Sequence, residues 1–578
     1  FVALLVAAFS SLEVVVMSVP AAGVLWAAVV LTHGAIEVAT SQVGPSLTVP
    51  GLGKLTGRYA SSPSHDVAMF LGIPFGKPPV GNLRWMPPEP YGAWQSPRDA
   101  TRYGSSCVGS DGGVGGSGVS EDCLFLNVVT QTVELGNTRR PTLVWIYGGT
   151  FDTGASNQFT PETLVSAAQQ PVVVVTLNYR INTFGFLGSR ALAARSKDGS
   201  TGNYGLQDQR LALMWVRDHI AAFGGRGDDV TIFGESAGGN SVLHHLVQPA
   251  SFGLYAKAII ESGTYDAGYP LADAEALYTE IIEKAGCGSD VDCFLGKSSK
   301  DVEVAKEKVA STSKLPELHW GPVVDGVSMS TSPQELIAAG KFNKKVPILM
   351  GSNRDEFSLM INLLNLTAYQ PWMGEAQFDS LVAYLGEGTV KKVKELYDPS
   401  VYSYPKDLGL FSQWWWTAMR VATDNGIPFH GFPKGVALGH CSARRIAQQL
   451  VRAGTPAVYL YNFARDNVDG QVGHGFELPF VFHRTPLLGL GQGNRDLSAA
   501  MVAYWTAFAD SGSPLPPSAA GLLQWPSYAP DGDMANMRFD ATFSASNLTI
   551  EYAFRKAACD FWDSLDAAKG PVSHDVLV

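Results

Sequence analysis

Short apolar runs alternate with helical segments along the first half of the chain. The runs at residues 141–147, 172–179 and 229–234 predict buried strands. Between the last two, apolar positions over residues 206–223 recur at helical spacing and predict an amphipathic helix. Further apolar runs predict strands at residues 256–260, 346–350 and 457–463. Strands separated by helices predict an α/β fold, in which helices cover both faces of a largely parallel sheet.

No internal repeat or long Ser/Pro-rich linker divides the chain, so we expect one domain with large insertions over residues 47–578. Residues 1–46 form a separate apolar leader. The run at residues 23–31 is typical of a secretory signal peptide, with Met17 as a plausible start. An uncleaved membrane anchor and a buried or disordered segment are the alternatives. Glu13 and Pro20 interrupt the run below the ~20 apolar residues that a span needs.

Composition excludes several classes of protein. Of the 578 residues 46% are hydrophobic and 16% charged, which is a globular balance. The net charge is −11 and no Lys/Arg-rich run is present, so we expect no nucleic-acid partner. No CxxC or four-histidine cluster indicates a metal, and we expect no cofactor. The oligomeric state is left open.

Cysteines and glycosylation sequons bear on the compartment. There are six cysteines, an even number, and four of them form two close pairs along the chain. Disulfides closing short surface loops would suit an oxidising compartment, whereas buried free thiols are the alternative. Sequons at Asn365 and Asn547 agree with secretion. We therefore expect a secreted glycoprotein.

The most informative short motif is Gly-Glu-Ser-Ala-Gly at residues 234–238, which has the form G-x-S-x-G. A predicted strand runs into it and a helix predicted at residues 240–247 follows, the setting that a nucleophile elbow requires. The glycines suit a turn too tight for side chains beside Ser236. The turn would place Ser236 at a helix N-terminus, whose N–H groups stabilise an oxyanion. A glycine-rich turn without chemistry is the alternative.

A serine nucleophile needs a base and an acid. In α/β-hydrolases the acid and then the histidine follow the serine along the chain, each in a loop after a later strand. Asp355 and Glu356 follow one predicted strand, and His474 follows another. Spacing alone leaves both acids open.

Other histidines are weaker candidates for the base. His244 and His245 lie on the helix behind Ser236 and are expected to point away from its hydroxyl. His483 is a rival nine residues past His474, and His430 and His440 flank a loop and are expected at the surface.

Several longer stretches resemble the type-B carboxylesterase/lipase family, which includes the cholinesterases and a group of fungal lipases. They lie at residues 72–81, 120–128, 144–149, 203–209 and 233–238. The resemblance spans most of residues 50–570. It implies an α/β-hydrolase fold and hydrolysis of a small-molecule carboxylic ester through an acyl-enzyme.

Residue by residue, the resemblance implies that Ser236 is the nucleophile, Glu356 the acid and His474 the base. It places the oxyanion donors on the backbone N–H groups of Gly149, Thr150 and Ala237. It also implies three disulfides: Cys107–Cys123, Cys287–Cys293 and Cys441–Cys559.

The sequence departs from the family pattern in informative places. Thr150 replaces a third glycine of the oxyanion loop, so we expect its side chain to crowd bulky esters. Phe357 replaces the glycine that often follows the acid. The Cys107–Cys123 loop is rich in Gly, Ser and Val and holds no Trp, which argues against a lipase lid and against a choline ester. Of Trp414, Trp415 and Trp416, we expect at least one in the core, and another is a candidate for the acyl gorge.

The leading hypothesis is a secreted carboxylesterase acting on soluble esters, without a stable membrane span. A lipase acting on insoluble glycerides is the first alternative. The second is a non-catalytic, cholinesterase-like adhesion module, but such relatives typically lack a triad residue, and all three are present here.

Overall fold

The computed structural model describes most of the chain from Gly44 onward. The described residues are 44–61, 66–131, 139–265, 268–312, 320–358, 369–383, 386–398, 409–426, 437–467, 469–484, 491–515 and 521–568. The expected signal segment, the sequon at Asn365, His430 and the C-terminal ten residues lie outside them, so the predictions about these residues stay predictions.

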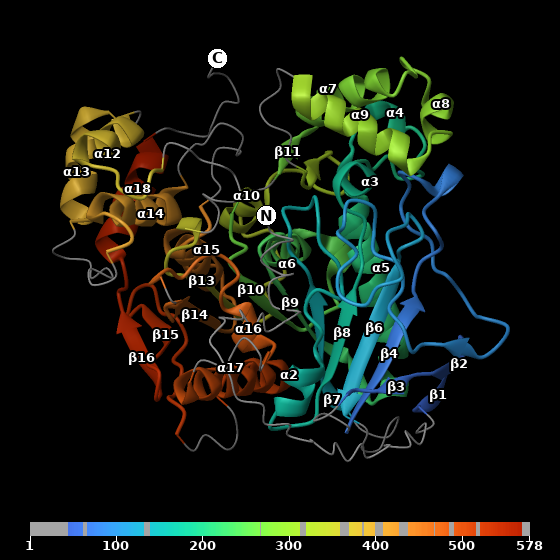
Figure 1. Cartoon of the computed structure of the whole chain (residues 1–578), viewed down its shortest axis with the longest axis horizontal. Helices are drawn as coiled ribbons and strands as arrows, with labels where there is room; N and C mark the ends of the chain where they lie inside the picture. Colours follow the sequence, from blue (N-terminus) through green and yellow to red (C-terminus); the bar gives the residue numbers. More distant parts are fainter. Residues whose placement is uncertain are drawn as a thin grey trace, which may run out of the picture. The chain divides into compact units, whose positions relative to one another are not determined.

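A mixed sheet of eleven strands forms the centre of the described structure (Figure 1). Its strands run in the spatial order β16 (Ser546–Tyr552), β15 (Ala535–Ala541), β14 (Val458–Phe463), β13 (Ile348–Asn353), β10 (Lys257–Glu261), β9 (Gly225–Glu235), β7 (Arg140–Ile146), β8 (Val173–Leu177), β6 (Phe125–Gln131), β4 (Val67–Pro74) and β3 (Arg58–Tyr59). The strands from β15 to β8 pair in parallel, and the pairs at both edges are antiparallel. The predicted α/β-hydrolase fold is thereby confirmed.

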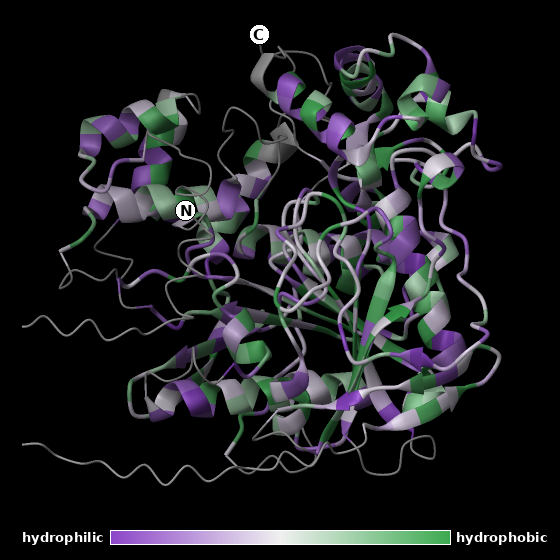
Figure 2. Cartoon of the chain, turned by 45° about the vertical axis from the view of Figure 1, so that its right-hand side comes forward, coloured by the Kyte–Doolittle hydropathy of each residue, from purple (hydrophilic) through white to green (hydrophobic). Residues whose placement is uncertain are grey.

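Burial on both faces explains why the central strands read as continuous apolar runs. All residues of β7, β8, β10, β13 and β14 are buried. Figure 2 shows strands at the centre of the sheet in the hydrophobic colour and helices around them in mixed colours. The predicted long helix is α5 (Tyr204–His219), and its last expected turn is a separate 3-10 helix, η2 (Ile220–Phe223). The helix ends early because the chain tightens before Gly224, which has φ +84°.

Helices cover both faces of the sheet. The helix α6 (Ala237–Val247) packs on β7, β9 and β10, and α15 (His440–Arg452) packs on β13 and β14. The longest helix, α17 (Gln492–Ser511), packs on β7, β15 and β16 and also contacts α2 (Glu162–Ala167). The carboxyl ends of the parallel strands lie at the same edge of the sheet. The loops that follow these strands therefore gather at that edge.

Smaller elements surround this sheet. They are β1 (Ser46–Val49), β2 (Gly53–Thr56), η1 (Gly81–Leu83), β5 (Arg98–Asp99), α3 (Asn182–Phe186), α4 (Arg190–Ala193), η3 (Pro249–Ser251), β11 (Tyr269–Pro270), α7 (Leu271–Lys284), α8 (Val291–Leu295), α9 (Ser299–Thr312), β12 (Val323–Val324), α10 (Pro333–Ala338), α12 (Glu375–Val382), α13 (Glu387–Leu396), α14 (Gln413–Asn425), α16 (Leu478–Val481) and α18 (Lys556–Ala568).

Three disulfides join the cysteines in the pairs that the family resemblance implied: Cys107–Cys123, Cys287–Cys293 and Cys441–Cys559. The third has a sequence separation of 118 and links α15 to α18. In the part of the chain that the structure describes, no helix is both long enough and apolar enough to cross a membrane.

Candidate active site

The G-x-S-x-G motif forms the sharp turn between β9 and α6. Both glycines lie against β7: a Cβ on Gly234 would stand 2.6 Å from the carbonyl oxygen of Ile146, and one on Gly238 would overlap that oxygen. Gly148 also lies close to the turn, because a Cβ added at Gly148 would stand 2.9 Å from the Cβ of Ser236. The glycines are therefore needed because three segments of backbone meet here.

Ser236 itself has a strained backbone, with φ +58° and ψ −125°. It occupies the position before the first turn of α6, yet its side chain caps none of the helix N–H groups. Its own N–H donates to the carbonyl oxygen of Glu261 at 2.9 Å, and the residue is 7% exposed. The strained backbone places the Ser236 hydroxyl at the N-terminus of α6, where the hydroxyl does not cap the helix.

Glu356 lies just after β13 and is completely buried. Its Oε1 accepts hydrogen bonds from the Ser262 hydroxyl and from the backbone N–H of Asn353, both at 2.6 Å. Its Oε2 lies 2.6 Å from Nδ1 of His474. Three donors around one carboxylate stabilise its charged form.

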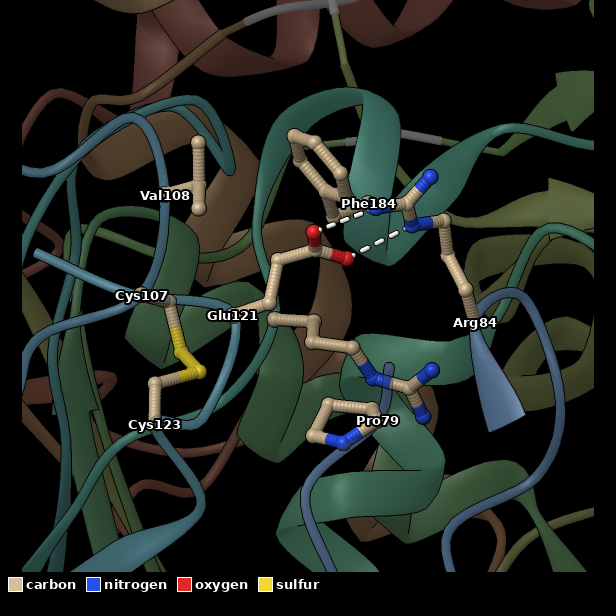
Figure 3. Close-up of a pocket in the computed structure, with 8 residues that line it drawn as sticks. Pro79, Arg84, Cys107, Val108, Glu121, Cys123 and Phe184 are labelled. Atoms are coloured by element: carbon tan, nitrogen blue, oxygen red, sulfur yellow. Dashed lines mark hydrogen bonds and ion pairs between the residues drawn. A yellow bond between two sulfur atoms is a disulfide. The ribbon is translucent and has the colours of Figure 1, made fainter. Parts of the chain in front are cut away.

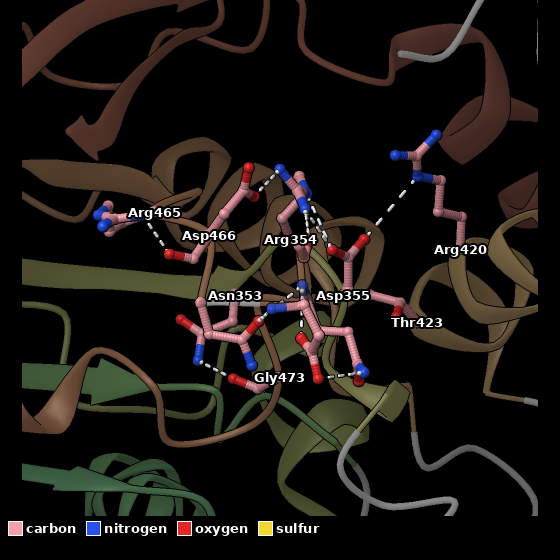
Figure 4. Close-up of polar contacts among 12 residues, drawn as sticks. Asn353, Arg354, Asp355, Arg420, Thr423, Arg465, Asp466 and Gly473 are labelled. Atoms are coloured by element: carbon pink, nitrogen blue, oxygen red, sulfur yellow. Dashed lines mark hydrogen bonds and ion pairs between the residues drawn. The ribbon is translucent and has the colours of Figure 1, made fainter. Parts of the chain in front are cut away.

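The neighbouring acid, Asp355, faces Arg354 and Arg420 (Figure 4). Its carboxylate pairs with Arg354 at 2.8 Å and lies 3.8 Å from Nε of Arg420. Burial alone would raise the pKa of Asp355, but the two arginines lower it overall. Arg555 donates to the carbonyl oxygen of Arg354 at 3.1 Å and pairs with Asp424 at 2.7 Å, which ties the start of α18 to this loop. Asp355 thus serves the loop's structure.

His474 stands between two glutamates. Besides Glu356 at Nδ1, it has Oε1 of Glu235 at 3.1 Å from Nε2. Burial lowers the pKa of His474, and the charges of Glu235 and Glu356 raise it above the ordinary value overall. Nε2 contacts the residue beside Ser236, and no hydrogen bond between His474 and Ser236 is formed among the described contacts. Such bonds often tighten only when substrate is bound.

The oxyanion candidates come from two segments. Gly149 and Thr150 follow β7 with φ +109° and +55°, and Ala237 is the first residue of α6. Within the described part of the chain the N–H groups of these three residues have no hydrogen-bond acceptor. The Thr150 side chain is exposed, and its hydroxyl donates to the carbonyl oxygen of Gly149 at 2.7 Å.

Among the described contacts, the other candidate histidines make none with Ser236 or Glu356. His245 contacts Ser251 and Gln209 at 2.9 and 3.0 Å, and His244 is buried on the same helix without a hydrogen-bond partner among the described residues. The ring of His483 lies 2.8 Å from the Ser498 hydroxyl. The surface placement expected for His440 is wrong, because this residue begins α15 and is buried against Phe554.

The aromatic triplet on α14 divides as helical geometry requires. Trp415 and Trp416 are buried, with Phe411 stacked on Trp415 at 4.0 Å between ring centroids. Trp414 is partly buried and packs on Phe378. The expected core role is confirmed, and the gorge role stays a prediction. Phe357 is buried as well.

Three residues of the site escaped the sequence analysis. Glu235 directly precedes Ser236, and Glu477 lies three residues after His474. These positions in the sequence were the available indication that both glutamates belong to the site. Ser262, which donates to Glu356, follows β10 and carries no motif at all.

The parallel sheet, the strained elbow and the glutamate–histidine pair together define an α/β-hydrolase. The model of the carboxylesterase family matches residues 43–562, and the chain belongs to this family. It is 32% identical over 516 residues to carboxylesterase 1C of Rattus norvegicus, covering 82% of this chain and 86% of that protein.

We expect Gly238→Ala to destabilise the protein by roughly 1–3 kcal/mol, because the added methyl group overlaps β7. Urea unfolding followed by tryptophan fluorescence measures the change. Gly388→Ala on α13 is the matched control, since open space surrounds that position and alanine favours a helix. Equal stability of the two variants would contradict the packing argument.

Proposed function

We propose that this protein is a serine carboxylesterase in which Ser236, His474 and Glu356 form the catalytic triad. The observation that carries the proposal is the 2.6 Å contact between Glu356 and Nδ1 of His474, beside a strained serine at a helix N-terminus. The carboxylesterase family to which the chain belongs supports ester hydrolysis as the reaction.

In the proposed mechanism, Nε2 of His474 takes the proton of the Ser236 hydroxyl as its oxygen attacks the ester carbonyl carbon. Glu356 holds the imidazole in the tautomer that presents Nε2 and stabilises the imidazolium. The N–H groups of Gly149, Thr150 and Ala237 receive the oxyanion, each such donor contributing roughly 3–4 kcal/mol. His474 then protonates the departing alcohol, and water releases the acid from Ser236 by the same steps.

We propose soluble esters as substrates, because the loop closed by Cys107–Cys123 is short and fastened down. Arg84 binds Glu121 of this loop through two contacts of 2.7 and 2.5 Å (Figure 3). Asn157 donates to the carbonyl oxygen of Val114 at 2.9 Å, and Asn182 to that of Val108 at 2.8 Å. The loop contains no helix, so it offers no amphipathic lid for an oil interface.

We further propose a secretory-pathway protein whose residues 47–578 form one catalytic domain. The three disulfides support an oxidising compartment. Asn547 is exposed on β16, where a glycan would be accessible.

Ser236→Ala should lower kcat on a short-chain chromogenic ester by roughly 10⁴-fold or more, because the nucleophile is lost. A fluorophosphonate probe should label the unsubstituted protein at Ser236, as mapped by peptide mass spectrometry. The Ser251→Ala variant, changed at another buried serine, serves as the control. An unlabelled, inactive protein would favour the adhesion-module hypothesis instead.

Glu235→Gln should move the acid limb of the kcat/KM profile to lower pH. His474 acts as a base only when deprotonated, and Glu235 raises its pKa. Activity is therefore lost as pH falls through that raised pKa, and removing the charge lowers the limb. The profile over pH 5–9 measures the shift, and an unmoved limb would show that Glu235 does not act on His474.

Thr150→Gly should raise kcat/KM for a bulky acyl ester relative to an acetyl ester roughly tenfold, because side-chain atoms leave the acyl approach. Thr150→Ala, which keeps Cβ, should give an intermediate ratio. Competition assays with paired p-nitrophenyl esters measure the ratio. If all three proteins share one preference, the crowding argument fails.

A further inference from the structure

Four buried glutamates lie in and beside the site, and two of them, Glu235 and Glu356, contact the imidazole of His474. Glu235 ends β9, Glu261 ends β10, Glu356 follows β13, and Glu477 directly precedes α16. The Tyr461 phenol on β14 faces all four, and its pKa is raised by burial and by their charges. Because a buried carboxylate without a partner is costly, the four cannot all be ionised beside one histidine.

Hydrogen-bond donors distinguish the four groups. Glu356 has the most donors, three. Glu261 receives one hydrogen bond, from Nε1 of Trp505 at 2.8 Å, and Glu477 receives one, from Asn353 at 2.5 Å. Glu235 is the second group that meets His474, at 3.1 Å. The two glutamates with one donor each are therefore the candidates for neutral acids.

Glu261 is placed to act on Glu235. The two residues are register partners on the parallel strands β9 and β10, so their side chains extend to the same face of the sheet. Oε2 of Glu261 is buried and has no hydrogen-bond partner among the described residues, whereas the buried Oε1 of Glu235 has Nε2 of His474 at 3.1 Å. The register-paired carboxyl group of Glu261 therefore has one buried oxygen without a donor, and a proton on that oxygen would satisfy it.

The electrostatics agree with this placement of the proton. Burial raises the pKa of Glu261 to about 8, with Trp505 opposing and Glu235 adding to the effect. Burial also raises the pKa of Glu235 to about 7, with His474 opposing. The positive charge of His474 favours the anion at Glu235, so the proton is better placed on Glu261.

We propose that Glu261 is a positioning residue of the catalytic site: in its protonated form it donates from Oε2 to Glu235 and holds Glu235 as the anion beside Nε2 of His474. The role deepens the proposed esterase function and rests on it. In the transition state His474 becomes an imidazolium, and an anion fixed beside Nε2 stabilises that charge.

Two substitutions separate the proton donor from mere packing. Glu261→Gln keeps an oxygen for Trp505 and an N–H donor for Glu235, so it should retain kcat within threefold and leave the acid limb unmoved. Glu261→Met fills similar space without either group. It should lower kcat tenfold or more and move the acid limb to lower pH, because Glu235 then takes up a proton and no longer raises the pKa of His474.

A stability measurement tests the proton without any substrate. The folded state holds the Glu261 proton up to about pH 8, against an ordinary pKa of 4.5, so native stability falls as pH rises between these values. Glu261→Gln has no proton to lose. Its Tm relative to the unsubstituted protein should therefore rise between pH 5 and 8.5, by roughly 3 °C. Glu283→Gln, an exposed site on α7, should show no such trend.

Three outcomes would overturn the proposal. They are a Tm difference for Glu261→Gln that is flat with pH, a loss of kcat in Glu261→Gln as large as in Glu261→Met, and a Tyr461→Phe variant that reproduces Glu261→Met, which would make the phenol the donor. If instead Ser236→Ala kept full activity, the esterase function would fail while the Tm trend could still hold.

Discussion

The hydrogen bonds that converge on the buried carboxylate of Glu356 are the interaction on which the site depends. They join the end of β13, the residue after β10 and the loop that carries His474, three segments far apart in sequence. A charged group with no water around it must keep all its donors, so these segments cannot move independently. The position of the imidazole is thus a consequence of satisfying one carboxylate.

The parallel sheet supplies the complementary constraint. Because β9 lies between β7 and β10, the elbow at its end must pass between two backbones, and only glycine fits at its tightest contacts. The register between β9 and β10 determines where β9 ends, just before Ser236, and it also pairs Glu235 with Glu261. The positions of Ser236 and of the Glu235–Glu261 pair therefore both depend on one strand alignment.

The features that depend mainly on residues close together in the chain could be predicted from the sequence. Fully buried parallel strands appear as apolar runs, so β7, β8, β9, β10, β13 and β14 were predicted from the sequence, and the glycines between a strand and a helix indicated the sharp turn at Ser236. Spacing could not choose between Asp355 and Glu356, because Asp355 is held by Arg354 and by Arg420, which lies 65 residues further along the chain. Ser262 and the burial of His440 were missed for the same reason: their partners come from distant elements.

The Cys441–Cys559 bridge, together with the hydrogen bond from Arg555 to the backbone of Arg354, lets α18 support a loop formed much earlier in the chain. A growing polypeptide that has passed His474 but not α18 already contains Ser236, Glu356 and His474, yet it lacks this crosslink and this arginine contact. The loop beside Glu356 therefore gains its full support only after α18 has been made.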